Sequence, residues 1–541
     1  MEKTNKPLIT FETWIPLFLG LVFFGITAPG VSWGAPDIWH PDELVIRVQQ
    51  ALNGEWQFDS TNFDYPSLPK YVMYGIGKIV YGLGYSKENF IVAARLFSVL
   101  LGSLVVGLSY RVTRLMGGGV FTGILASILL ITNSQMATDS RWAHNDLYVT
   151  FFVFLSVYFL VQYSLTGKRV WLFLTFLGVG LAASSKYNAG SLILAPILLY
   201  LFVEHKKKVS NFLEMGIVIF HGLMISAIGY AIGTPKSILW LAFYIKRLLP
   251  ALKHHAVYGR EPGSTIGLLG QWSTLGQVLG WFVFIWVVVA IVYTVITLVK
   301  KFADSKELVG KQLASVAILT SMVLIDIPII ISYNYPNRFF LPLLPMLFVL
   351  VALFTQDEFQ FFKDHGKRYI NYALIGVVVL VISSSFLRVV SVYLLFKNDP
   401  RIPASAFLQT LPQGSRIEYT LYPPSINRQQ FSNPHNYPLI FIKYEDFTLP
   451  SSGAYDYNVG EVGIEQRKPD YLIIDSFTYE RFNDPYVCSL HQADCDFFRR
   501  LLAGETNYRL LETFSYSLHR YLPDPQIGFV NPTIKVYQRK P

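Results

Sequence analysis

The chain has 541 residues, of which 52% are hydrophobic and 16% aromatic, whereas only 15% are charged. Soluble domains carry about 25% charged residues, so this composition excludes an ordinary soluble protein. The net charge of +9 does not indicate a nucleic-acid partner. Lys and Arg lie mostly in short loops between apolar runs, where such residues set the orientation of a membrane protein.

Eleven apolar runs approach the length of about 20 residues that crosses a bilayer, and they predict an all-α polytopic membrane protein. The first run follows a polar start and has no convincing small-residue cleavage site, so we interpret it as a retained helix and not as a signal peptide. The predicted spans are 12–32, 90–112, 118–135, 146–164, 170–185, 188–204, 212–233, 276–299, 311–332, 339–355 and 372–396.

Basic residues occupy alternate loops between these spans, for example at Arg111, Lys168 and Lys206 to Lys208. The positive-inside rule therefore places the N-terminus and these loops in the cytoplasm, and an odd number of spans places the chain after residue 396 outside. The compact loops favour a bacterial inner or plasma membrane.

Two outer segments of the transmembrane part, residues 1–396, are too long to be simple connections. Segment 33–89 contains an amphipathic stretch, Leu68 to Tyr85, that we expect to lie along the membrane interface. Segment 234–275 predicts an interfacial helix followed by a flexible loop, Gly259 to Gly263, able to close over a lipid headgroup.

Residues 397–541 predict a small extracytoplasmic α/β domain. Short strand-like runs occur at 416–421, 471–475 and 533–537, between Pro- and Gly-rich turns. The only two cysteines, Cys488 and Cys495, are able to form a disulfide if this domain is outside the cytoplasm, although their spacing alone does not prove one.

Ionisable residues gather at the predicted outer ends of the spans. Asp42 and Glu43 follow the first span, Asp146 opens the fourth, Lys186 closes the fifth, and Arg338 lies between the ninth and tenth. Charges at this depth are costly unless they are paired or functional. We therefore predict that these residues share one site on the outer face.

This set of residue types suits displacement at a sugar carbon with a phosphate leaving group. One carboxylate can take the proton of an attacking hydroxyl, and Lys and Arg can neutralise the departing phosphate. A second carboxylate can hold sugar hydroxyls or a divalent cation. A lipid-linked donor would reach such a site sideways from the bilayer.

Each residue also has a purely structural interpretation. Asp42-Glu43 and Asp146 could cap helices, Lys186 could extend to the membrane interface, and Arg338 could anchor a helix there. His40 and His144 each neighbour an acidic residue, but two such pairs far apart in sequence are a weak metal signal. No metal ligand is assigned.

Together these positions resemble the glycosyltransferase C (GT-C) superfamily, in particular its protein O-mannosyltransferase and aminoarabinose transferase branch. The resemblance covers about 400 residues, the whole transmembrane part. It rests on motifs found in the superfamily's order: His40-Pro41-Asp42-Glu43, Tyr65-Pro66-Ser67-Leu68-Pro69, Ala94-Arg95-Leu96-Phe97-Ser98, Ser140-Arg141 with Asp146, Ser185-Lys186-Tyr187 and Arg338-Phe339-Phe340-Leu341-Pro342.

The resemblance implies a GT-C fold and transfer of a sugar from a polyprenyl-phosphate carrier to a protein, lipid or glycan hydroxyl. It also implies residue roles. Catalytic roles fall to Asp42 as the base, Glu43 and Asp146; donor-phosphate binding falls to Lys186, Arg338, Arg95 and Arg141; substrate contacts fall to His40, His144, Tyr65, Lys70 and Tyr187. Ser67 and Phe339 depart from the branch motifs, so neither aminoarabinose nor lipid A is carried over.

Two alternatives stay open. A transporter or flippase needs polar groups near the bilayer midplane, and Asp326, inside the ninth predicted span, is the residue that best fits this alternative. A ligase that moves an assembled glycan would share the carrier and the topology. Four or five charges at one outer surface favour the single-sugar transferase.

Overall fold

The computed structural model describes residues 11–55, 65–205, 212–248, 265–305, 308–436 and 460–541. The chain divides into two compact units. The membrane unit comprises residues 1–31, 42–257 and 265–390, and the second unit combines Ser32–Pro41 with Ser391–Pro541. The short segment before Asp42 therefore packs with the C-terminal part of the chain and not with the helices on either side of it.

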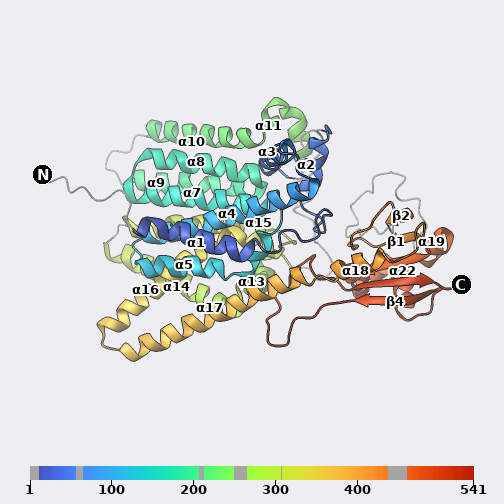
Figure 1. Ribbon diagram of the computed structural model, residues 1–541. Coiled ribbons are helices and arrows are strands. Elements are labelled where there is room, and N and C mark those ends of the chain that lie inside the picture. Colours follow the sequence, from blue (N-terminus) through green and yellow to red (C-terminus); the bar gives the residue numbers. More distant parts are fainter. Residues whose placement is uncertain (1–10, 56–64, 206–211, 249–264, 306–307, 437–459) are drawn as a thin grey trace. The chain divides into compact units, whose positions relative to one another are not determined.

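The membrane unit is a bundle of apolar helices (Figure 1). Within the described residues, eight helical segments are long and apolar enough to cross a bilayer, and three further apolar helices are shorter. Each of the eleven predicted spans coincides with one of them, which confirms the predicted fold class. The helices are α1 (Phe11–Thr27), α4 (Lys87–Leu115), α5 (Val120–Ile131), α7 (Asp146–Thr166), α8 (Arg169–Ser185), η1 with α9 (Tyr187–Ile193, Leu194–His205), α10 (Phe212–Gly233), α14 (Trp281–Ser305), α15 (Lys311–Ile330), η2 with α16 (Asn337–Leu343, Leu344–Asp364) and α17 (Arg368–Lys397).

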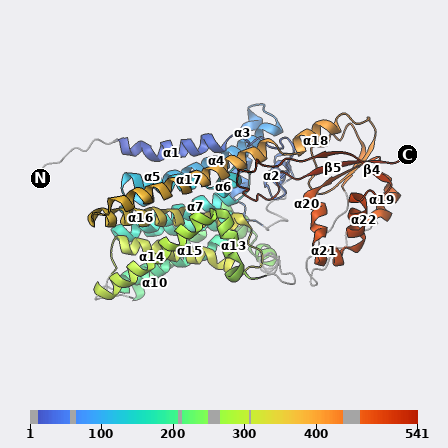
Figure 2. The same cartoon turned by 90° about the horizontal axis from the view of Figure 1, so that it is seen from below.

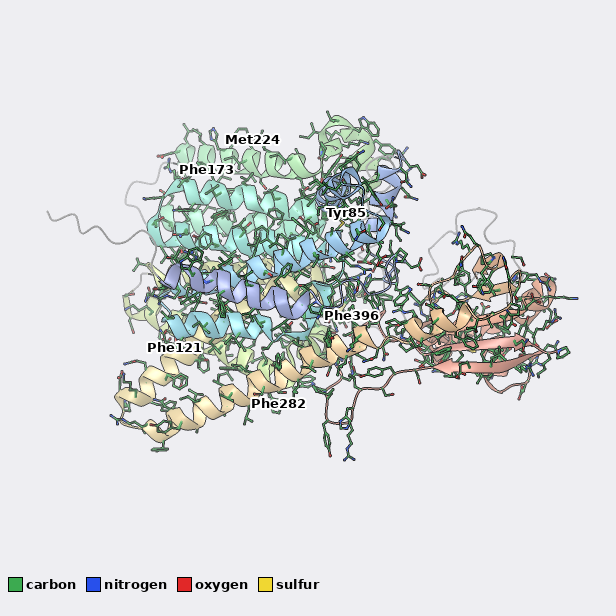
Figure 3. The ribbon with its side chains drawn as sticks, in the orientation of Figure 1. Tyr85, Phe121, Phe173, Met224, Phe282 and Phe396 are labelled. Carbon is green, nitrogen blue, oxygen red and sulfur yellow. A yellow bond between two sulfur atoms is a disulfide. The ribbon has the colours of Figure 1, made fainter. Side chains whose placement is uncertain are left out.

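Apolar side chains cover both the inside and the outside of this bundle, as a lipid environment requires. Phe121, Met224 and Phe282 are 87%, 48% and 71% exposed, and they point away from the bundle (Figure 3). Small residues allow helices to approach closely. A Cβ atom on Gly180 of α8 would lie 2.1 Å from the carbonyl oxygen of Ser226 in α10, so the contact between these helices requires glycine there.

Shorter helices gather at one end of the bundle, where α1 and α8 end and α4 and α7 begin (Figures 1 and 2). The predicted amphipathic stretch forms α3, and the predicted interfacial helix of segment 234–275 corresponds to α11 and a helix at 241–248. The predicted lid, Gly259 to Gly263, lies outside the described residues. The helices at this end include α2 (Val45–Leu52), α3 (Leu68–Gly82), α6 (Ser134–Asp139), α11 (Lys236–Leu239) and α13 (Gly267–Leu279).

The second unit contains a five-stranded mixed sheet in the order β2-β1-β3-β5-β4. Strands β2, β1 and β3 are parallel, whereas β5 pairs antiparallel with both β3 and β4. Every residue of the central strand β3 is buried, which is typical of a strand covered on both faces. The strands are β1 (Arg416–Tyr419), β2 (Ser432–Asn436), β3 (Tyr471–Asp475), β4 (Tyr508–Phe514) and β5 (Ile534–Arg539).

Helices pack on both faces of this sheet. One core contains Ile464, Phe498 and Leu501 from helices α19 and α22, and the other contains Ala404 and Leu408 from α18. Cys488 and Cys495 form a disulfide. The helices are α18 (Arg401–Leu408), α19 (Gly460–Arg467), α20 (Ser476–Tyr479), η4 (Glu480–Asn483), α21 (Pro485–Leu490) and α22 (Gln492–Leu502).

Candidate active site

Four residues from distant parts of the chain form one charged cluster in the membrane unit. The Arg338 guanidinium donates from Nη2 to Asp42 Oδ2 at 2.7 Å, and its Nε lies 3.9 Å from Asp146 Oδ2. Lys186 Nζ donates to Asp146 Oδ1 at 2.6 Å. The structure thus joins two carboxylates and two cations in the order Asp42, Arg338, Asp146, Lys186.

Helix ends place these side chains. Asp146 is the first residue of α7, where the helix dipole favours a negative charge. Lys186 follows α8 in an extended conformation that turns the chain into η1. The Asn145 side-chain amide donates to the Ser185 carbonyl at 3.2 Å, which fixes the start of α7 against the end of α8. Lys186 Nζ also lies 4.0 Å from the centre of the Phe339 ring, a cation–π geometry.

Burial differs strongly among the four side chains. Asp146 is 2% exposed and Lys186 10%, whereas Arg338 is 16% and Asp42 33% exposed. His144 Nδ1 lies 2.5 Å from the second oxygen of Asp146. Asp146 is therefore enclosed by positively charged or hydrogen-bonding groups, while Asp42 is the carboxylate that a substrate can reach.

Glu43 and Arg95, which are not part of the cluster, form a fully buried ion pair. Arg95 donates from Nε and Nη2 to the two oxygens of Glu43 at 2.8 and 2.7 Å, and from Nη1 to the Val31 carbonyl at 2.8 Å. The Ala143 amide donates to Glu43 at 2.7 Å, and the Leu44 amide donates to the Ala143 carbonyl at 3.0 Å. This pair holds the segment that carries Asp42 against the segment that carries Asp146.

Arg141 is 1% exposed and bonds to backbone carbonyls. It donates to the carbonyl oxygens of Ala137, Pro29 and Ile26 at 2.6, 3.1 and 3.3 Å. Carbonyls near the end of a helix lack partners inside the helix, and an arginine supplies donors to them. In this position Arg141 connects α6 to the end of α1.

Asp139 is a buried acidic residue whose charge interacts with the cluster and which the sequence analysis did not single out. It ends α6, is 2% exposed, and its Oδ2 accepts a hydrogen bond from Gln135. Within the described residues its Oδ1 has no hydrogen-bond partner. Burial, with the nearby charge of Asp146, raises the pKa of Asp139 to about 8. The signal that could have found it is an acidic residue two positions before Arg141, in the inter-span segment that directly precedes Asp146.

The predicted substrate contacts fall into two places. Tyr65 packs edge-on against His144 with ring centres 5.5 Å apart, and Lys70, 1% exposed, donates to the Tyr65 carbonyl at 3.1 Å. Tyr187 begins η1, directly after Lys186. His40, in contrast, belongs to the second unit and packs against Phe529 at 4.9 Å. Among the described residues no group of three or more His, Cys, Asp or Glu side chains is arranged to hold a metal ion.

An apolar groove of about 350 Å³ lies between α8, η1 and α10. Its walls include Gly180, Ala183, Leu223 and Ala227, and Ala183 precedes Lys186 by about one helical turn. Tyr230 is also part of the wall. The groove has a mostly apolar lining, which suits a hydrocarbon chain.

Asp326, which the sequence singles out inside the ninth predicted span, lies in α15 and is partly buried. Its carboxylate forms a side-chain hydrogen bond with Gln271 of α13. The charged cluster does not include it.

Residues 76–249 match the family model of the dolichyl-phosphate-mannose-protein mannosyltransferases, a range that contains Arg95, Arg141, Asp146 and Lys186. This match confirms the resemblance to glycosyltransferases predicted from the motifs. No curated protein sequence matches the chain.

Solved structures resemble this chain in fold, among them an oligosaccharyltransferase and ArnT. The oligosaccharyltransferase AglB from Archaeoglobus fulgidus, in complex with an inhibitory peptide and a dolichol-phosphate, matches with a TM-score of 0.51 at 10% identity, over 95% of this chain and 75% of that chain. ArnT from Cupriavidus metallidurans, bound to undecaprenyl phosphate, matches with a TM-score of 0.50 at 12% identity, over 97% and 98%. The predicted GT-C fold is confirmed, and the chain is an integral membrane protein.

Proposed function

We propose that this protein is a glycosyltransferase that moves a sugar from a polyprenyl-phosphate carrier to the hydroxyl group of an acceptor. The observation that carries the proposal is the cluster of Asp42, Arg338, Asp146 and Lys186 at the end of an apolar bundle, in which α8 and α10 also line an apolar groove. The match to a family of lipid-phosphate-sugar transferases supports the same reaction class.

Lys186 and Arg338 are the proposed phosphate-binding residues. Both cations lie within 4 Å of Asp146, so a phosphate group between them would meet two positive charges. Charge-assisted hydrogen bonds of this kind are among the strongest in proteins. The carrier's hydrocarbon chain would occupy the apolar groove between α8 and α10, where it would exchange one apolar environment for another.

Asp42 is the proposed general base. It is the more exposed of the two paired carboxylates, at 33% against 2% for Asp146. In the reaction the acceptor oxygen attacks the anomeric carbon of the donor while Asp42 takes the hydroxyl proton. The bond between that carbon and the phosphate oxygen breaks, and the electron pair leaves with the polyprenyl phosphate, whose charge Lys186 and Arg338 stabilise.

Asp146 is proposed to position the two cations and not to touch the acceptor, because it is almost fully buried between them. Glu43, Arg95 and Arg141 are proposed to be structural. Their charged groups are engaged inside the protein with one another or with backbone carbonyls, which leaves a phosphate no open approach to either arginine. The proposal uses no divalent cation, since both carboxylates of the cluster already have cationic partners.

The proposed site faces the extracytoplasmic side of the membrane. The cluster lies at the end of the bundle where α8 ends and α7 begins. The basic residues of the predicted cytoplasmic loops, such as Lys168 and Lys363, lie at the other ends of these or neighbouring helices. Their positions support an outer site through the positive-inside rule.

The test measures release of polyprenyl phosphate from a panel of polyprenyl-phosphate sugars by the full chain in proteoliposomes. We expect the wild type to release it, Asp42→Asn to lower the rate by about 100-fold or more, and Asp304→Asn to leave the rate unchanged. Asp304 is an exposed carboxylate near the end of α14. Movement of intact lipid-linked sugar across the bilayer, without cleavage, would instead establish a transporter.

A further inference from the structure

The second unit contains a cavity of about 200 Å³ that the charged cluster does not explain. Part of its wall is the segment Asp37–Trp39, and the rest comes from Arg401 at the start of α18 and from the chain that follows β1. Tyr422 and Arg428 belong to that second part. The volume corresponds to about seven water molecules, which is the size of one monosaccharide.

Two buried donors beside this cavity lack hydrogen-bond partners among the described residues. They are Trp39 Nε1 and Arg401 Nη1, on side chains of residues that are 8% and 0% exposed. Other donors nearby do have partners. Trp33 Nε1 donates to the Asp399 carboxylate at 3.0 Å, and the Nε and Nη2 atoms of Arg401 donate to the same carboxylate at 3.0 and 2.8 Å. Buried donors without a partner are costly, so two beside one cavity indicate a ligand with acceptor oxygens.

The charges around the cavity indicate that this ligand is neutral. Asp399 balances the charge of Arg401 in a fully buried ion pair, and the exposed Arg428 is matched by Asp37 on the same cavity wall. An isolated anion would therefore meet no net positive charge. Hydroxyl groups, in contrast, can accept from the two N–H groups and donate to the Asp37 carboxylate.

The remaining surface is aromatic. Tyr419 and Tyr422 form part of the wall with Trp39, and the Arg401 guanidinium lies 4.6 Å from the Trp39 ring centre, which holds the indole in place. Rigid rings of this kind offer apolar faces at low entropic cost. A pyranose presents an apolar C–H face as well as hydroxyl groups, so it satisfies both parts of the wall.

We propose that this cavity is a saccharide-binding site, and that it holds a sugar residue of the acceptor. The role of the cavity in acceptor binding depends on the proposed function, whereas saccharide binding itself does not. Trp39 precedes Asp42 by three residues in the chain, so the segment that contacts the saccharide is continuous with the one that carries the base. The acceptor is accordingly a glycan or glycolipid with a neutral sugar.

The test uses methyl pyranosides of the gluco, galacto and manno configurations, titrated onto the full chain in nanodiscs without a donor and followed by calorimetry. We expect one of them to bind the wild type. Trp39→Phe keeps a ring but removes the N–H, so binding should weaken about five-fold or more while the thermal midpoint stays unchanged, because that N–H has no partner to lose. Trp33→Phe is the matched control: it removes the bond to Asp399, so the midpoint should fall while binding changes by less than about two-fold.

Arg428→Gln, on the exposed rim, provides a second variant that does not affect a buried group, and we expect about ten-fold weaker binding. The proposal is overturned if no pyranoside binds, if Trp39→Phe and Arg428→Gln both bind as well as the wild type, or if inorganic phosphate binds in place of the pyranosides. The same titration on Asp146→Asn separates the two proposals. Binding that persists in a chain without transferase activity supports the saccharide site whatever the fate of the proposed reaction.

Discussion

Asp139→Asn tests whether the buried carboxyl near Asp146 is protonated at neutral pH. Burial raises the pKa of Asp139 from its ordinary value of 3.8 to about 8. At a pH between these two pKa values, Asp139 of the folded protein holds a proton that the unfolded chain has released, so a rise in pH favours unfolding. The stability that this group contributes is fully present below pH 4 or so and is lost as the pH rises to about 8.

The expected size follows from the linkage relation. One proton of difference changes the free energy of unfolding by about 1.4 kcal/mol per pH unit, so the wild type should lose about 3 kcal/mol between pH 5 and 7 through Asp139 alone. Asn cannot ionise, so the Asp139→Asn variant does not show this loss of stability with rising pH. The buried amide lowers stability by about 1–3 kcal/mol if its donors find no partner, but that cost does not depend on pH.

The assay is the thermal midpoint of both proteins in one detergent from pH 5 to 9, reported as the midpoint of the variant minus that of the wild type. This difference should rise by several degrees up to about pH 8 and then level off. Asp304→Asn, which changes an exposed carboxylate, serves as the control and should give a flat difference. A flat difference for Asp139→Asn as well would refute the assignment of a protonated, desolvated carboxyl to this position.

Four further substitutions test the cluster, the buried pair of Glu43 and Arg95, and the second unit. Lys186→Ala should slow release of polyprenyl phosphate by about 100-fold or more because the leaving group loses one neutralising cation; Lys186→Arg should restore part of the rate, and equal rates in all three proteins would contradict the role. Glu43→Gln should lower the free energy of unfolding by about 3–5 kcal/mol, because it breaks the buried pair with Arg95, and the thermal midpoint measures the loss. Cys495→Ser opens a short disulfide loop and should reduce the stability of the second unit by about 2–3 kcal/mol, with transfer rates unchanged below the midpoint; a lower rate at 25 °C would show that this unit acts in catalysis.

The spans and the central strands could be predicted because each has a strong local signal. A run of about 20 apolar residues has few stable alternatives to a membrane helix, and the strand-like runs at 416–421, 471–475 and 533–537 correspond to β1, β3 and β5. Strand β2 was missed because Ser432–Asn436 is a polar segment without alternation. Strand β4 was missed because its pairing with β5 shifts register between Leu510 and Glu512, which interrupts the period-two pattern.

The composition of the charged cluster could be predicted from depth, but the pairing of its residues could not. Hydropathy places a residue along the membrane normal and says nothing of its direction around a helix. Glu43 and Arg95 were expected to act on substrates, yet they lie 52 positions apart and form one buried pair. Asp139 and Asp146 carry the same type of side chain, and only the surrounding cations distinguish the paired carboxylate from the one whose pKa is raised.

The arrangement of the cluster explains how one set of charges could serve two stages of the proposed reaction. Without a donor, Asp42 and Asp146 balance Arg338 and Lys186, which avoids the cost of burying unpaired cations. A donor phosphate competes for the same cations, and Asp42 is the partner that can yield, since its side chain is one-third exposed whereas that of Asp146 is almost fully buried. Asp146 keeps both cations in place. Binding of the donor would thereby free the Asp42 carboxylate to accept the proton of the acceptor hydroxyl.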